Sequence, residues 1–240
     1  MAEKCGFYCL SYKNPERKAA MENRFKNLGV DVFMYDGVSL DDERIVGRDI
    51  HDHSKRCWSF TYGHFDLIRE FYFNSEKEYG IFCEDDIYIR KDFIDHLPKI
   101  VENFETLKLD LLLLGYLSQH TLNEKYPGVH LKETIVNDEH PFSYYTYPDS
   151  IWGAQMYMLS KMQAGDLLDK YSPPYADLSI GNSSMKSFNS DWTITKEGNR
   201  ALIYPMFALE DGKTKYADQG QYILHQECHK AHYIKDLFYE

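Results

Sequence analysis

The first part of the chain has a pattern that predicts a strand, a helix and a second strand. Residues 5–11 are mainly apolar, and Asn14-Pro15 follows as a helix cap with proline at the first helical position. Apolar residues then recur at helical spacing up to Gly29, and residues 30–35 form a second apolar stretch before a turn at Asp36-Gly37. This β-α-β order predicts a parallel sheet, in which ligands bind beyond the carboxyl ends of the strands.

The alternation of helices and strands continues along the chain. Later helices are predicted over residues 61–73 and 93–104, and later strands over residues 80–83, 109–115 and 151–159. Two irregular segments, residues 118–148 and 172–189, are longer than ordinary connections and are candidates for acceptor-binding loops. No repeat or linker divides the 240 residues, so we expect one α/β domain with a mixed, mostly parallel central sheet flanked by helices.

Composition narrows the partners and the compartment. The net charge is −11 and the basic residues are dispersed, which argues against a nucleic-acid partner. The five cysteines include no Cys-x-x-Cys pair and the N-terminus lacks an apolar signal core, so we expect a reducing, cytoplasmic compartment. The longest purely apolar run, residues 111–114, is too short for a transmembrane segment, although contact with a membrane surface stays open. The sequence has no signature of oligomeric state.

Candidate chemistry is concentrated after residues 80–83, where Glu84, Asp85 and Asp86 follow in a row. Three adjacent carboxylates repel one another unless a cation or several hydrogen-bond donors lie among them. If the segment is extended, Glu84 and Asp86 point to one side, and Asp85 faces a hydroxyl or a backbone donor on the other. Hard oxygen ligands select Mg²⁺ or Mn²⁺, so we predict a metal site; a solvated acidic turn is the alternative.

Two further groups of residues could carry chemistry. Ser190 can cap a short helix with Asp191 in its first turn, where the carboxylate either stabilises the helix dipole or acts as a general base. One face of a predicted helix carries His225, His229 and His232. These histidines could be surface groups or a zinc site, or His225 alone could complete the acidic metal site. The chain lacks the phosphate-loop, Gly-x-Gly-x-x-Gly and Gly-x-Ser-x-Gly motifs, which argues against nucleoside triphosphate hydrolysis, dinucleotide redox chemistry and serine hydrolysis.

Several segments, taken in order, resemble the family 25 glycosyltransferases, which include lipopolysaccharide-chain and procollagen galactosyltransferases. The resemblance spans residues 5–210 and rests on Phe7 to Ser11, Asn14-Pro15-Glu16-Arg17, residues 32–37, residues 62–68 around His64, Glu84-Asp85-Asp86, Asp92-Phe93, residues 110–115, residues 153–160 with Ala164 and Leu167-Leu168, and Asp191-Trp192. The chain departs from the family at Gly63, where the family has serine, and at Ser11-Tyr12, where it has asparagine.

This resemblance implies a GT-A fold, a UDP-sugar donor, and Mn²⁺ or Mg²⁺. It further implies transfer of galactose or glucose, usually with inversion, to a hydroxyl of a glycan or of a hydroxylated peptide. We expect residues 1–115 to bind the nucleotide sugar and the metal, and residues 116–240 to bind the acceptor. Two alternatives stay open, namely a metal-dependent sugar nucleotidyltransferase and a non-catalytic module that binds sugar nucleotides or glycans.

The expected roles can be assigned residue by residue. Metal ligands are expected at Glu84, Asp86 and His225, and the catalytic base at Asp191. Arg17 is expected to neutralise phosphate, because a guanidinium can donate two parallel hydrogen bonds to it. The expected donor-binding residues are Ser11, Tyr12, Asn14, Arg17, Asp36, Gly37, His64 and Asp85.

Overall fold

The structure, a computed structural model, describes residues 2–122, 128–132, 141–213 and 218–240. Within these residues an eight-stranded sheet has the order β2-β1-β3-β8-β5-β9-β7-β6. Its strands are β1 Cys5–Ser11, β2 Phe33–Asp36, β3 Tyr79–Glu84, β5 Leu111–Leu117, β6 His130–Leu131, β7 Ser143–Thr146, β8 Trp152–Ser160 and β9 Arg200–Tyr204. β7 and β8 run antiparallel to both of their neighbours, and the other neighbouring strands pair in parallel. The predicted α/β class with a mixed, mostly parallel sheet is therefore confirmed.

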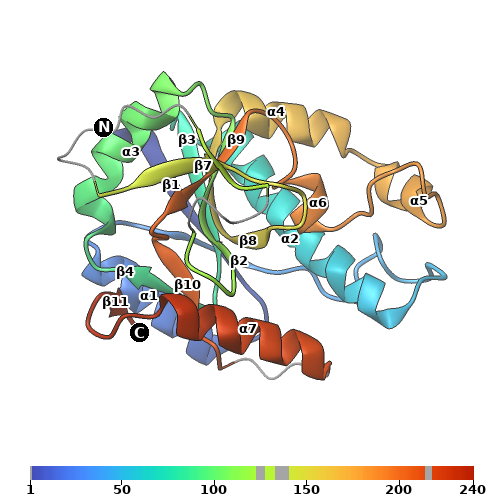
Figure 1. Ribbon diagram of the computed structural model, residues 1–240. Helices are drawn as coiled ribbons and strands as arrows, with labels where there is room; N and C mark the ends of the chain where they lie inside the picture. The colour runs from blue at the N-terminus through green and yellow to red at the C-terminus, as the bar shows by residue number, and fades with distance from the viewer. Residues whose placement is uncertain (1, 123–127, 133–140, 214–217) are drawn as a thin grey trace.

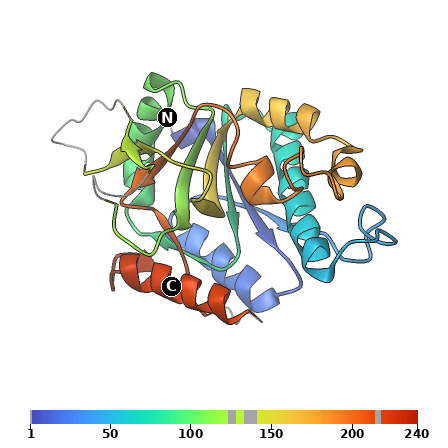
Figure 2. The same cartoon turned by 45° about the vertical axis from the view of Figure 1, so that its right-hand side comes forward.

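Helices cover both faces of this sheet. They are the short 3₁₀ helix Ala2–Lys4, α1 Pro15–Asn27, α2 Asp52–Asn74, α3 Phe93–Thr106, α4 Lys161–Lys170, α5 Tyr175–Ser179, α6 Ser190–Thr193 and α7 Gln219–His232. Figures 1 and 2 show α2 and α4 on one face and α3 on the other. Buried side chains divide in the same way, with Phe65 and Ile68 of α2 in one apolar cluster and Phe25 of α1 and Phe104 of α3 in the second. None of the helices in the described ranges is both long enough and apolar enough to cross a membrane.

A smaller sheet connects the C-terminal region to the acidic strand end. It consists of β10 Ala208–Glu210, β4 Ile87–Arg90 and β11 Phe238–Tyr239, with β4 in the middle. β4 begins directly after Asp86, and α7 packs against β10. In Figures 1 and 2, α7 lies across one end of the molecule. β10 and α7 are thereby brought to the strand end that carries the three carboxylates.

Local sequence signals located most elements but not all of their ends. α1 begins at Pro15, and Asn14 Oδ1 accepts a hydrogen bond from the Arg17 backbone N–H at 3.1 Å, as the predicted cap requires. α2 begins at Asp52, nine residues before the predicted start at residue 61. The reason is a cap that was not anticipated, because His51 Nδ1 accepts from the His53 backbone N–H at 3.1 Å.

The two segments expected to be irregular contain regular structure. Part of residues 118–148, namely 123–127 and 133–140, lies outside the described residues; the rest includes β6 and β7. Residues 172–189 include α5. β7 pairs with β9 and with the edge strand β6, so this part of the first segment belongs to the sheet rather than to a loop.

Candidate active site

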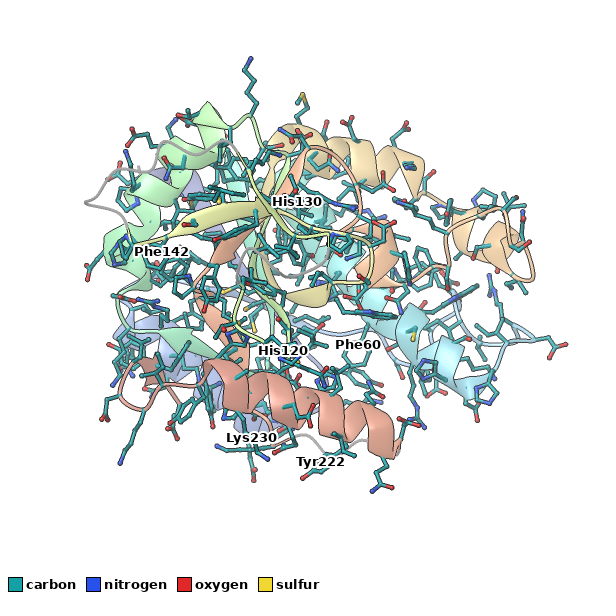
Figure 3. All side chains as sticks on the ribbon, in the orientation of Figure 1. Phe60, His120, His130, Phe142, Tyr222 and Lys230 are labelled. Carbon is teal, nitrogen blue, oxygen red and sulfur yellow. The ribbon has the colours of Figure 1, made fainter. Side chains whose placement is uncertain are left out.

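A cavity of about 320 Å³ lies at the carboxyl ends of β1 and β3. Eight side chains that the sequence singled out line it, namely Tyr12, Asn14, Arg17, Glu84, Asp85, Asp86, Asp191 and His225. They come from the β1–α1 connection, the turn between β3 and β4, the first turn of α6, and α7. Phe60 of α2 and Gln221 of α7 also line the cavity. Figure 3 labels Phe60, and it labels Tyr222, which follows Gln221 in α7. Both halves of the chain thus meet in one cavity.

A wider recess of about 520 Å³ adjoins this cavity, and Tyr12 and Asn14 line both spaces. Ser11, Asp36 and Gly37 line the recess. The parallel register of β1 and β2 explains this grouping, because Ser11 pairs with Asp36. The Gly37 backbone N–H also donates to the Ser11 carbonyl oxygen at 2.9 Å. The recess therefore lies at the ends of β1 and β2, beside the acidic cavity.

The three adjacent carboxylates have different partners. Asp85 Oδ2 accepts from the Ser11 hydroxyl at 2.7 Å, and Asp85 Oδ1 lies 3.7 Å from Arg17 Nη1. Asp86 Oδ2 lies 3.4 Å from the same nitrogen. Asp85 therefore does face a hydroxyl, as predicted. The extended geometry assumed for the triplet is wrong, however, because β3 ends at Glu84 and the next two residues form a turn.

Burial and crowding raise the pKa of these carboxyl groups. Burial is the largest cause of the raised pKa of Glu84, and the charges of Asp191 and Glu210 act next, bringing that pKa to about 8. Burial also raises the pKa of Asp86 well above its usual range, and Arg17 acts in the opposite direction. Glu84 keeps 27% of its side chain exposed, so its carboxyl group faces the cavity. The cavity holds more negative charge than Arg17 offsets, and a bound cation would favour the ionised forms.

The first turn of α6 holds Asp191 in the cavity wall. Asn189 Oδ1 accepts from the Asp191 backbone N–H at 2.9 Å, so the helix cap is Asn189 and the prediction of Ser190 is wrong. Asp191 Oδ1 accepts from the Gly153 backbone N–H at 2.8 Å, which ties the carboxylate to the start of β8. The charge of Asp191 is the largest one acting on the pKa of Glu84, so the two carboxylates interact across the cavity.

The three histidines share one face of α7, as predicted, but each binds a protein group. His225 Nδ1 is hydrogen-bonded to the Glu210 carboxylate, and His229 Nδ1 donates to the Glu210 carbonyl oxygen at 2.8 Å. His232 Nε2 donates to the Ser118 carbonyl oxygen at 2.9 Å. These contacts dock α7 onto β10 and onto the residue after β5. The shared face is a packing face rather than a zinc site, and His225 is the member that also lines the cavity.

Glu210 belongs to the site, although the sequence analysis did not identify it. Its side chain is buried, it binds His225, and its charge raises the pKa of both Glu84 and Asp86. A signal was present, because the apolar residues 206–209 end in Glu210-Asp211. The same pattern of an apolar run ending in acidic residues marks the strand before Glu84.

His64 lies behind the cavity wall. Its side chain is 0% exposed, its Nδ1 is hydrogen-bonded to the Tyr157 hydroxyl at 3.0 Å, and its Nε2 lies 3.4 Å from Glu84 Oε1. Burial lowers its pKa to about 4, so the ring is neutral near pH 7. The direct contact with a donor that the family resemblance implied conflicts with this burial. His64 instead orients Glu84 from the protein side.

The carboxylate oxygens in the cavity suit a hard divalent cation whose remaining ligands are water and substrate phosphates. Among the residues described by the structure, no group of three or more His, Cys, Asp and Glu side chains is arranged to hold a metal ion by itself. Mg²⁺ sites commonly use one or two carboxylates together with water and substrate phosphates. Glu84 and Asp86 supply carboxylates of this kind, and Glu210 with His225 lies beside them.

Comparisons with known proteins find solved structures that resemble this chain at low sequence identity. No family model matches the chain, and no curated protein matches it. A protein from STIV is 15% identical with a TM-score of 0.41, over 88% of this chain and 91% of that one. A glycosyltransferase involved in glycosylation of the major capsid of PBCV-1 is 11% identical with a TM-score of 0.35, over 92% and 98%. HddC from Yersinia pseudotuberculosis is 14% identical with a TM-score of 0.33, over 95% and 78%. Because these scores are low, the functional proposal rests on the site.

Proposed function

We propose that this chain is a metal-dependent glycosyltransferase that moves galactose or glucose from a UDP-sugar to a hydroxyl of a glycan or a hydroxylated peptide. The observation that carries the proposal is one cavity with Glu84, Asp86 and Arg17 on one wall and Asp191 on another. The first wall suits a diphosphate with a cation, and the second suits an attacking hydroxyl. The choice of a UDP-sugar and of a hexose comes from the resemblance to the family 25 glycosyltransferases.

The donor would occupy the recess and the cavity together. Tyr12 and Asn14 line both spaces, so a nucleoside in the recess would direct its diphosphate toward Arg17. Arg17 Nη1 lies 3.7 Å from Asp85 Oδ1 and donates to Asp86 Oδ2 at 3.4 Å. A guanidinium has five N–H donors, so Arg17 could also donate to a phosphate beside these carboxylates. In this arrangement residues 1–115 bind the donor and residues 116–240 face the acceptor.

Asp86 and Glu84 would hold Mn²⁺ or Mg²⁺, with His225 as a third protein ligand. When bound, the cation supplies a Lewis acid that stabilises the negative charge on the departing UDP. His64 keeps Glu84 in place from behind, and Glu210 holds the His225 ring through Nδ1. Such outer partners orient the side chains that contact a metal.

Asp191 would act as the general base. Its Oδ1 is held by the Gly153 N–H, which fixes the carboxylate so that its second oxygen can accept the proton of the acceptor hydroxyl. The acceptor oxygen forms its bond to the anomeric carbon on the face opposite the leaving group, while the bond from that carbon to the UDP oxygen breaks. UDP leaves with the electron pair, and the configuration at the anomeric carbon inverts.

Turnover with isosteric variants tests this function. Purified protein is incubated with Mn²⁺ and a panel of UDP-sugars and acceptors, and released UDP is measured. We expect Asp86→Asn to lower the rate by about 10²-fold or more, because it weakens the binding of the cation that would stabilise the negative charge on the departing UDP. Asp166→Asn, which changes an exposed carboxylate on α4, is the matched control and should leave the rate unchanged.

Asp191→Asn tests the base separately. We expect the transfer rate to fall by about 10²- to 10⁴-fold with UDP affinity unchanged. Unchanged turnover at saturating donor and acceptor would remove Asp191 from the mechanism. Pyrophosphate release from UTP and a sugar phosphate would instead identify a nucleotidyltransferase. Binding of a UDP-sugar without turnover or metal dependence would identify a binding module.

A further inference from the structure

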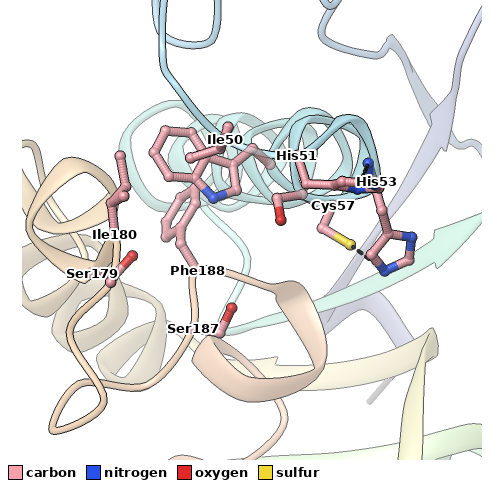
Figure 4. Close-up of a pocket in the computed structure, with 11 residues that line it drawn as sticks. Ile50, His51, His53, Cys57, Ser179, Ile180, Ser187 and Phe188 are labelled. Carbon is pink, nitrogen blue, oxygen red and sulfur yellow. Dashed lines mark hydrogen bonds between the residues drawn. The ribbon is translucent and has the colours of Figure 1, made fainter.

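A second cavity, of about 290 Å³, lies beside the first turn of α2 and the segment before α6. Figure 4 shows Ser179 and Ile180 on one side of it, His51, His53 and Cys57 on the other, and Phe188 between them. Its size is near the lower limit of about 300 Å³ for pockets that hold small molecules. A single sugar ring is a ligand of suitable dimensions.

The lining favours a neutral ligand that carries hydroxyl groups. Among the described residues around this cavity, none is Asp, Glu, Lys or Arg. Serine hydroxyls and imidazoles, which can donate and accept hydrogen bonds, come from Ser54, Ser179, His51 and His53. His51 uses Nδ1 to accept from the His53 backbone N–H at 3.1 Å, which orients its ring.

Apolar side chains complete the second cavity. Ile50, Trp58, Ile180 and Phe188 line it, and 42% of Ile180 is exposed. Carbohydrates present hydroxyl groups at the edge of the ring and C–H groups on its faces, so they need both kinds of contact. A charged peptide side chain would find no opposite charge in this lining.

Cys57 connects this cavity to the site of the proposed reaction. Its side chain lines both cavities. The thiol lies 3.6 Å from His53 Nε2, a hydrogen bond that Figure 4 marks, so it is held between the two spaces. A ligand in the second cavity therefore lies one side chain away from the wall that carries Asp191.

We propose, on the basis of the glycosyltransferase function proposed above, that the second cavity is an acceptor subsite for a neutral sugar residue adjacent to the one whose hydroxyl reacts at Asp191. An acceptor of two or more sugars passes over Cys57, with one ring in each cavity. The acceptor is then a glycan rather than a single sugar.

Protection of Cys57 from alkylation tests both cavities in one experiment. Cys57 is the cysteine that is not buried, so iodoacetamide should label it selectively in the folded protein, and mass spectrometry gives the rate. The probes are UDP with Mn²⁺ for the acidic cavity, and lactose, cellobiose or maltose for the second cavity. At about ten times its Kd, a ligand that covers Cys57 should slow labelling about tenfold, because the unbound fraction alone reacts.

Two variants separate the cavities. Ile180→Trp should fill the second cavity from the side opposite Cys57, and Asp86→Ala should weaken UDP binding in the first. Protection is taken as the ratio of rates with and without ligand for each variant, so that any shielding by the new side chain cancels. Ile234→Trp is the control, because Ile234 is also exposed and does not line either cavity.

The proposal is supported if at least one disaccharide protects Cys57 in the Asp86→Ala and Ile234→Trp variants but does not protect it in the Ile180→Trp variant. Protection by UDP and Mn²⁺ with none by the disaccharides, or saccharide protection that persists in Ile180→Trp, overturns it while the proposed function stands. Protection by a short hydroxylated peptide alone overturns the sugar assignment. Saccharide protection without any effect of UDP, together with no UDP release from a UDP-sugar, refutes the proposed function and with it the acceptor role.

Discussion

Lys196 is a buried cation that holds the segment carrying Asp191. Its Nζ donates to the Ile151 carbonyl oxygen and to Thr195 Oγ1 at 3.1 Å, and Thr195 Oγ1 in turn donates to the Asp191 carbonyl oxygen at 2.7 Å. The side chain is 6% exposed, and burial lowers its pKa from 10.5 to about 8. The variant that probes this arrangement is Lys196→Met, which keeps the apolar stem and removes the titrating group.

The magnitude follows from the two pKa values of Lys196. The difference between 10.5 and about 8 corresponds to about 3 kcal/mol, at 1.36 kcal/mol per pH unit. Because the folded pKa is the lower one, the unfolded chain binds more protons between about pH 8 and pH 10.5. The free energy of unfolding therefore rises with pH in this range. The stability that neutral Lys196 provides is fully present above pH 10.5 and is lost as the pH falls through about 8. Between pH 7.5 and 9.5 it amounts to about 2 kcal/mol.

Urea unfolding at pH 7.5 and pH 9.5 measures this contribution. Cysteines and tyrosines also titrate at high pH, but their effects cancel when the wild type is compared with Lys196→Met. We expect the free energy of unfolding of the wild type to rise by about 2 kcal/mol relative to the variant. Lys235→Met, at an exposed position, is the control and should follow the wild type. A difference between wild type and Lys196→Met that stays constant with pH would refute the conclusion that Lys196 is desolvated.

Two further substitutions test the supports of the site. Gly153→Ala would place a Cβ 2.6 Å from the Tyr116 Cα, and a backbone atom cannot move aside, so we expect a loss of about 1–3 kcal/mol in urea unfolding together with a lower kcat. Gly220→Ala, inside α7, is its control and should be neutral or stabilising; equal behaviour of the two variants would contradict the packing argument. Glu210→Ala removes the partner of the His225 ring, so we expect Tm to fall by roughly 2–10 °C and hydrogen exchange to speed up in α7. Faster exchange spread evenly over the chain would show that Glu210 does not specifically hold α7.

The features that the sequence predicted correctly depend on neighbours in the chain. The cap at Asn14 acts on Arg17 three residues later, and β2 ends at Asp36, one residue beyond the predicted end of the apolar stretch. The position of Glu84, Asp85 and Asp86 after an apolar strand is likewise visible in a few consecutive residues. Physical rules for helix ends, turns and strands operate over this range, so the parallel β-α-β start and its acidic strand end could be predicted.

Other properties of the site arise from contacts between distant residues. His64 and Tyr157 are 93 positions apart, and their contact depends on the insertion of antiparallel β8 between β3 and β5. The same insertion brings Gly153 to Asp191, a contact that no local pattern specifies. Glu210 lies next to His225 of the cavity wall because β10 pairs with β4 and α7 packs against β10.

The sequence by itself determined the chemistry available to this protein: three carboxylates at a strand end, an arginine at a helix start, and a further carboxylate near the start of α6. The tertiary structure decided which of these groups share a cavity, and it placed His64 behind the wall and Cys57 between two cavities. The physical reason is that residue type sets charge and hydrogen-bonding capacity locally. Burial and proximity, which shift a pKa or create a binding surface, depend on how strands far apart in the sequence are ordered in the sheet.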